Sequence, residues 1–128
     1  MYDPPDMTEL VTAVREFLEE QALPRLEGRT AFHARVAANA LAIVERQLSL
    51  GPAAEAAEHA RLCELLGRGA GEANLESLNR DLCKRIRDGQ LGIHSPGLTE
   101  HLRRTTLDKL AVDQPRYSGY RRAVSGND

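Results

Sequence analysis

Apolar residues recur at helical spacing along most of this chain. Side chains three and four residues apart lie on one face of a helix. Such stripes predict five helices, at about residues 7–22, 30–50, 52–66, 75–88 and 98–114. No segment alternates with the two-residue period of a strand. The pattern therefore predicts an all-α fold, a single-domain antiparallel bundle of about five helices.

Residues at the ends of these segments indicate where the helices begin and end. Asp6 and Glu9 have the spacing of a capping box, and Pro52 suits the first turn of a helix. Thr30 and Asn74 are expected N-caps for two other helices. The glycines expected to end helices are Gly51, Gly67 and Gly89. We therefore expect separate helices on the two sides of residues 51 and 52.

The first two predicted helices have well-defined apolar faces. The expected buried residues of the first are Met7, Leu10, Val11, Val14, Phe17 and Leu18. Those of the second are Phe32, Val36, Ala40, Ile43, Val44 and Leu50, widened by Ala37, Leu41 and Leu48. This second arc is too broad for a helix that packs on one neighbour. We therefore expect the helix at 30–50 to lie at the centre of the bundle.

The sequence after residue 114 has a different character. The stretch "PRYSGYRRAVSGND" is polar and basic and contains Gly and Ser. Terminal segments of this kind are poorly ordered unless they dock on the rest of the domain. We interpret residues 1–114 as a helical bundle domain and residues 115–128 as a basic, flexible tail.

Charge is distributed unevenly, although the net charge is only −2. Residues 1–64 carry six Lys and Arg against eleven Asp and Glu, and residues 65–128 carry eleven against eight. A bipolar surface suits docking on another protein better than nucleic-acid binding, which usually requires a basic domain. No apolar run has the length of a membrane span, and no signal-peptide pattern is present. We expect a cytoplasmic protein that does not contact membranes.

Four polar residues stand at the start of the otherwise apolar helix 30–50: Arg29, His33, Arg35 and Asn39. The helical period places Asn39 within about 20° of Phe32, so Asn39 is expected to point inward as a structural polar residue. His33 is expected to be partly covered, one turn from Arg29. Two interpretations remain open. Either neighbouring carboxylates and backbone groups satisfy the cluster, or it binds a partner or ligand.

Patterns that would indicate an enzyme are absent from the sequence. No Ser or Cys is arranged with a His as an activated nucleophile, and no paired inward carboxylates accompany a base. Cys63, Cys83 and the four His residues lack the spacing of a zinc site. We expect no catalysis by this chain alone, no metal and no cofactor.

A family resemblance is carried by three stretches: "LVTAVREFLEEQALPRLEGRTAFHARVAANALAIVERQL", "GPAAEAAEHARLCELLG" and "LRRTTLDKLAVDQPRY". With "YDPP" near the start, they cover most of residues 2–117 and resemble a family of small bacterial proteins. Members are typically encoded beside an aminoglycoside-phosphotransferase-like kinase and an acyl-CoA dehydrogenase. They are similar to the small accessory subunit of levulinate catabolism, where such a kinase phosphorylates a 4-hydroxyacyl-CoA.

This resemblance is strongest within the polar cluster, at Gly28, Arg29, Phe32, His33, Arg35, Val36, Asn39 and Ala40. It is weaker at Lys109, Leu110, Pro115, Arg116 and Tyr117. The resemblance implies a non-catalytic partner of the kinase, with possible indirect contact with acyl-CoA. The candidate binding residues are then Arg29, His33, Arg35, Arg116 and Tyr117. The alternative hypothesis is a helical DNA-binding or regulatory module.

Overall fold

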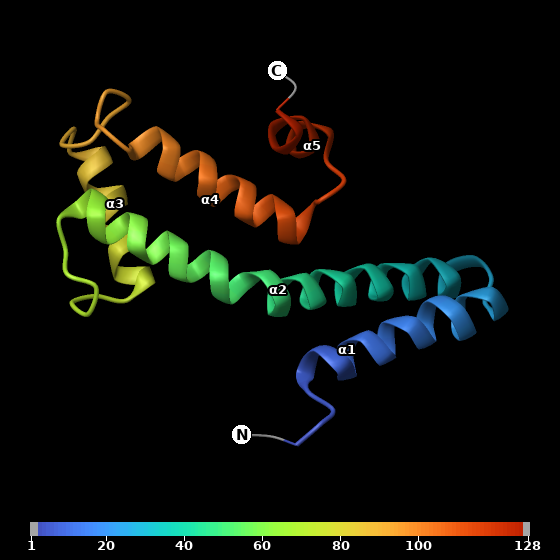
Figure 1. The fold of residues 1–128 in the computed structure, drawn as a ribbon. Coiled ribbons are helices and arrows are strands. Elements are labelled where there is room, and N and C mark those ends of the chain that lie inside the picture. Colours follow the sequence, from blue (N-terminus) through green and yellow to red (C-terminus); the bar gives the residue numbers. More distant parts are fainter. Residues whose placement is uncertain (1–2, 127–128) are drawn as a thin grey trace. The chain divides into compact units, whose positions relative to one another are not determined.

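The structure is a computed structural model that describes residues 3–126, and every regular element in this range is helical (Figure 1). The α-helices are α1 (Met7–Glu16), α2 (Gly28–Leu66), α3 (Leu75–Arg87), α4 (Leu98–Asp113) and α5 (Ser118–Ser125). A π-helical segment, η1 (Phe17–Ala22), and a 3₁₀ turn, η2 (Leu23–Arg25), continue from α1. The prediction of an all-α fold with about five helices is confirmed.

The long helix α2 corrects the boundary expected at Gly51 and Pro52. One helix runs through both residues, with Pro52 inside it. Proline lacks the N–H that would bond the carbonyl of Leu48, but the following run "AAEAAEHA" consists mostly of strong helix formers. The same position nevertheless divides the chain into two compact units, unit 1 (Met1–Gly51) and unit 2 (Pro52–Asp128). Helix α2 contributes its first half to unit 1 and its second half to unit 2.

Helix starts agree with the expected caps in two of three cases. Asp6 and Glu9 form a reciprocal capping box, with distances of 2.9 and 2.7 Å between each backbone nitrogen and the other residue's carboxylate. The Asn74 side chain accepts a hydrogen bond from the Ser77 backbone N–H at 2.9 Å. Thr30 is not a cap, because α2 begins two residues earlier, at Gly28.

Unit 1 is an antiparallel pair, α1 and the first half of α2 (Figure 1). Glu45 on α2 accepts hydrogen bonds from the Thr12 hydroxyl and, at 2.6 Å, from Arg15 Nε. These two hydrogen bonds hold the pKa of Glu45 below its usual range, and the bond from Thr12 has the larger effect. In the described part of unit 1 the buried apolar side chains are Ala31 and Ala38. Two alanines make a small core.

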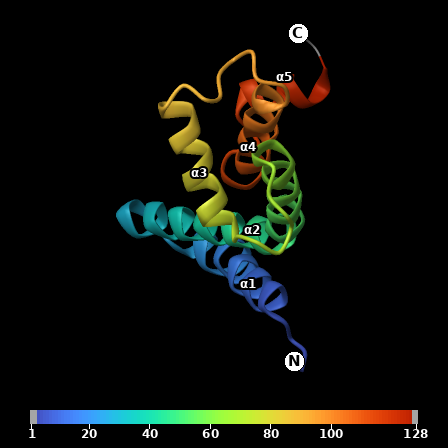
Figure 2. The ribbon, with the colours of Figure 1, turned by 90° about the vertical axis from the view of Figure 1, so that its left-hand side faces the viewer.

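Unit 2 has a larger apolar core, built by three helices. The second half of α2 contributes Leu62, Cys63 and Leu66, α3 contributes Leu78 and Leu82, and α4 contributes Leu98. Figure 1 and Figure 2 both show α4 next to this half of α2, and the packing of leucines in this core also joins α3 to both helices. The ring of His59 bonds the Ala73 carbonyl at 2.9 Å and so fastens the loop between α2 and α3.

Helix α5 lies within the segment that the sequence indicated as a flexible tail. It spans Ser118–Ser125, contacts α4 and ends at Gly126, which has a left-handed φ of 69°. Arg103 of α4 donates a long hydrogen bond, 3.5 Å, to the Ala123 carbonyl. The segment therefore docks through a few contacts, which its polar composition did not indicate.

Candidate docking surface

The four polar residues at the start of α2 do not form a closed site. Arg29, His33, Arg35 and Asn39 are all exposed. A ring contact joins His33 to Phe32, with centroids 5.5 Å apart and planes at 70°. The prediction that Asn39 points into a core, and that His33 is partly covered, is wrong. The structural role assigned to Asn39 stays a prediction, without burial to support it.

The exposure of residues in the first half of α2 depends on which side of the helix faces α1. Ala31, Ala38 and Glu45 are seven residues apart, and Glu45 bonds α1, so this series faces α1. Val36 precedes Ala38 by two residues, which is a rotation of about 200° around a helix. Val36 and the residues in its own heptad series therefore point away from α1.

The side that faces away from α1 has the heptad pattern of a coiled-coil seam. At alternating steps of three and four it contains Arg29, Phe32, Val36, Asn39, Ile43, Arg46 and Leu50. We call this set the outer seam. Its four large apolar residues are 58% (Phe32), 49% (Val36), 37% (Ile43) and 43% (Leu50) exposed. The prediction that they are buried is wrong, because α1 occupies the opposite side.

The outer seam is large enough to bind another helix. Four apolar side chains of this size, each roughly half exposed, leave on the order of 400 Å² of apolar surface, similar to the largest patches on monomeric proteins. An Asn within a heptad seam can specify the register of a partner helix at a cost in stability. His33 and Arg35 occupy the flanking heptad positions, where charged residues pair across coiled coils. The flanks of this seam are therefore positively charged or neutral.

Helix α1 and the following η1 carry a second exposed apolar series. Met7, Leu10, Val14 and Phe17 are each more than half exposed, although the sequence pattern indicated burial. Residues 7–22 also carry more acidic than basic side chains, with Glu9, Glu16, Glu19 and Glu20 and one basic residue, Arg15. In residues 28–51 the balance is reversed, with Arg29, Arg35 and Arg46 against Glu45. The two helices of unit 1 thus offer apolar surfaces of opposite charge.

Arg116 and Tyr117, the remaining candidate residues, lie between α4 and α5 in unit 2. Both are exposed, and Tyr117 is the residue immediately before α5. Its backbone N–H bonds the Gln114 carbonyl at 3.0 Å, which closes the turn between the helices. The geometry gives Tyr117 a local role in this turn.

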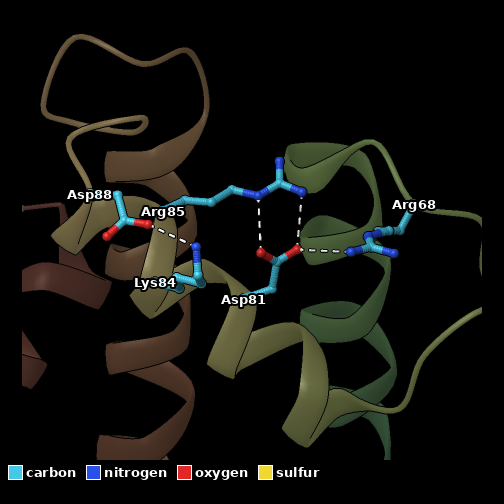
Figure 3. A network of polar contacts seen from close by, with 5 residues as sticks. All are labelled: Arg68, Asp81, Lys84, Arg85 and Asp88. Atoms are coloured by element: carbon cyan, nitrogen blue, oxygen red, sulfur yellow. Dashed lines mark hydrogen bonds and ion pairs between the residues drawn. The ribbon is translucent and has the colours of Figure 1, made fainter.

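A network of ion pairs lies on α3 and the loop before it (Figure 3). Arg85 donates to both carboxylate oxygens of Asp81 at 3.1 and 3.0 Å, and Arg68 approaches the same carboxylate at 3.4 Å. Lys84 pairs with Asp88 at 2.9 Å. The hydrogen bond from Arg85 is the main reason that the pKa of Asp81 is lowered. Three cations therefore share two carboxylates in this network, and each cation contacts at least one of them.

Two side chains that the sequence pattern did not single out line one pocket in unit 2. The pocket has a volume of about 460 Å³ and is lined by Arg61 and His101, among others. His101 is only 3% exposed, and neither its Nδ1 nor Arg61 Nε has a hydrogen-bond partner among the described residues. Burial is the main cause that lowers the pKa of His101. The burial of His101 could have been predicted from its position in the sequence, three residues after Leu98 and therefore on the same, buried side of α4.

Within residues 3–126, no group of three or more His, Cys, Asp or Glu side chains could hold a metal ion. Within the same range no helix combines the length and apolar character needed to cross a bilayer.

Comparison with known proteins gives one match. Residues 24–117 match the family described as "Domain of unknown function (DUF6285)". Neither the curated proteins nor the solved structures give a significant match. The matched region contains all of α2, α3 and α4 and therefore both the outer seam and the pocket of unit 2. Because the match spans most of the chain, this protein belongs to the DUF6285 family.

Proposed function

We propose that this protein is a non-catalytic accessory subunit that docks on an aminoglycoside-phosphotransferase-like kinase. The kinase acts on a hydroxyacyl-CoA in acid catabolism, and this chain contacts the acyl-CoA at most indirectly. The family resemblance of the sequence supports the kinase as the partner. The observation that carries the docking proposal is the outer seam of α2, whose large apolar residues are exposed.

The seam favours one mode of recognition, a helix of the kinase packed along the first half of α2. Val36, Ile43 and Leu50 would then contact apolar residues of that helix, as in other helix-in-groove complexes. Arg29 and His33 would lie beside acidic side chains or phosphate groups. Arginine suits this role because its planar fork donates two hydrogen bonds to one carboxylate or phosphate.

Co-expression with the neighbouring kinase tests the proposal directly. We expect the two chains to co-purify, and Val36→Ser to weaken the complex at least tenfold, because apolar anchors at the centre of an interface dominate affinity. Val14→Ser on α1 is the matched control, since it makes the same change at a residue of similar exposure. Equal effects of the two substitutions would exclude the outer seam as the specific docking surface.

The polar residues are tested separately. Arg29→Ala and His33→Ala should leave the thermal unfolding of the isolated protein nearly unchanged, because both residues are exposed. They should weaken kinase association or slow phosphorylation of the hydroxyacyl-CoA. If either variant lowers the melting temperature by several degrees and leaves the kinase unaffected, these residues are structural.

The DNA-binding alternative predicts a different result. Such a module would be retained on duplex DNA at moderate salt and released as salt increases, because phosphate contacts release counterions. Retention on DNA together with failure to bind the kinase would overturn the accessory-subunit proposal.

A further inference from the structure

The pocket beside Arg61 and His101 combines three features that favour an anion. Arg61 comes from the second half of α2, whereas His101 belongs to the first turn of α4. Both side chains line the pocket of about 460 Å³. The third feature is the N-terminus of α4, whose N-cap, Gly97, also lines the pocket. Pro96 and Leu65 complete an apolar part of the wall.

Each of these groups has unused hydrogen-bonding capacity. No side chain among the described residues caps the N-terminus of α4. The N–H groups of Leu98 and His101 bond backbone carbonyls, which leaves those of Thr99 and Glu100 for a ligand. Arg61 Nε and His101 Nδ1 are buried without partners, which costs free energy unless an acceptor or donor meets them. The terminal nitrogen of Arg61 has only long contacts, 3.3 Å to Thr105 and 3.6 Å to Asp108. Arg61 can therefore turn toward an acceptor that enters the pocket.

The charges around the pocket select a ligand with one negative charge. Arg61 lines the pocket together with two carboxylates, Glu64 and Glu100, and Glu100 is paired with Arg104 at 2.6 Å. Glu64 repels any anion in the pocket, and it repels a doubly charged ligand more strongly than a singly charged one. A phosphate group, with a charge of about −1.5 to −2 at neutral pH, fits this balance less well than a carboxylate. The apolar wall suits a short alkyl chain.

We propose that this pocket of unit 2 binds a small aliphatic carboxylate. The carboxylate accepts hydrogen bonds from Arg61, from His101 and from the first turn of α4, and its alkyl chain contacts Leu65 and Pro96. This proposal concerns other residues than the outer seam and does not depend on a kinase partner.

Protonation of His101 is linked to the same site. Burial and the neighbouring Arg61 lower its pKa, against a smaller opposing effect of Glu58, so the ring is neutral near pH 7. A neutral imidazole donates a hydrogen bond through one of its two nitrogens. A bound carboxylate would stabilise the protonated, positively charged form of the ring. Carboxylate binding should therefore raise the pKa of His101, which NMR of the imidazole nitrogens can measure.

Backbone and imidazole NMR of the full chain tests the proposal, with sodium acetate, sodium butyrate and sodium phosphate as probes and sodium chloride at equal ionic strength as reference. We expect saturable shifts at residues 99–101 and in the His101 ring, tighter for butyrate than for acetate and weakest for phosphate. Arg61→Gln should reduce butyrate affinity at least tenfold. Arg68→Gln, outside the pocket, should leave it unchanged.

Three outcomes would overturn the proposal: shifts that match the chloride reference, affinity for phosphate equal to or above that for butyrate, and unchanged butyrate affinity in Arg61→Gln. If Arg61→Gln does not fold, because its contacts to Thr105 and Asp108 are lost, His101→Gln replaces it. That variant should bind butyrate more weakly, and full retention of affinity counts against the site.

Discussion

The two halves of helix α2 differ in what covers them. In unit 2, α3 and α4 pack against the second half, and Leu62 and Leu78 are completely or almost completely buried. In unit 1, α1 covers one side of the first half, and the buried apolar side chains of its described part are alanines. Large apolar residues are available in both units. Only unit 2 uses them to build a core, and in the described part of unit 1 they remain largely exposed.

The largest expected effect comes from truncating the core of unit 2. Leu78→Ala should lower the free energy of unfolding by about 3 kcal/mol, because it leaves a cavity among closely packed leucines. Leu10→Ala in unit 1 makes the same chemical change at a residue that is 52% exposed. Chemical denaturation of both variants measures the difference. Similar losses would show that Leu10 is also part of a packed core.

A second prediction concerns the point where the two units meet along α2. Pro52→Ala should stabilise the protein by about 1–2 kcal/mol, because alanine restores the missing backbone hydrogen bond and has a higher helix propensity. The change should appear as a higher melting temperature and more helical circular dichroism. A lower melting temperature would mean that the proline conformation is required at this position.

The contact between α1 and α2 should have a moderate effect. Glu45→Gln should cost about 1 kcal/mol at neutral pH, since it weakens the charge-assisted bonds from Thr12 and Arg15. The pKa of Glu45 is lowered in the folded state, so its contribution is present above pH 4.5 and is lost as the pH falls through the folded value. The variant should therefore lose less stability on acidification. Parallel pH profiles of the two proteins would contradict this.

The smallest effect is expected on the outer seam. Phe32→Ser should change the stability of the isolated protein by less than about 0.5 kcal/mol, because exposed positions tolerate substitution. Its contribution should appear only when the partner is bound. Thermal unfolding of the variant, with and without the partner, distinguishes an effect on the isolated protein from an effect on binding. A clear loss in the isolated protein would show that Phe32 is covered within the chain.

Helix type and several helix ends could be predicted from sequence because they depend on local chemistry. The Asp6 and Glu9 box, the Asn74 cap and the glycines at 67 and 89, both with positive φ, involve residues within one turn of the helix end. The boundary at Gly51 and Pro52 could not be predicted reliably. Proline removes one hydrogen bond there, and the good helix formers after it are sufficient to continue the helix.

The candidate site was predicted less completely. The sequence indicated a polar cluster at Arg29, His33 and Asn39 on a broad apolar helix, and the structure places all three on α2 as expected. Their exposure could not be predicted, because a wide apolar arc does not say how many helices cover it. Arg61 and His101 are forty residues apart and come together only through the packing of α4 on α2.

The helical character of the chain, the ends of most helices and the positions of apolar residues could all be read from the amino-acid sequence. These properties follow from backbone hydrogen bonds and side chains within a few residues of one another. Which apolar face is buried could not be read in this way, because burial depends on which distant helix packs there. In this structure Leu78 and Leu82 of α3 are buried, the large apolar residues of the outer seam are exposed, and Arg61 and His101 line one pocket.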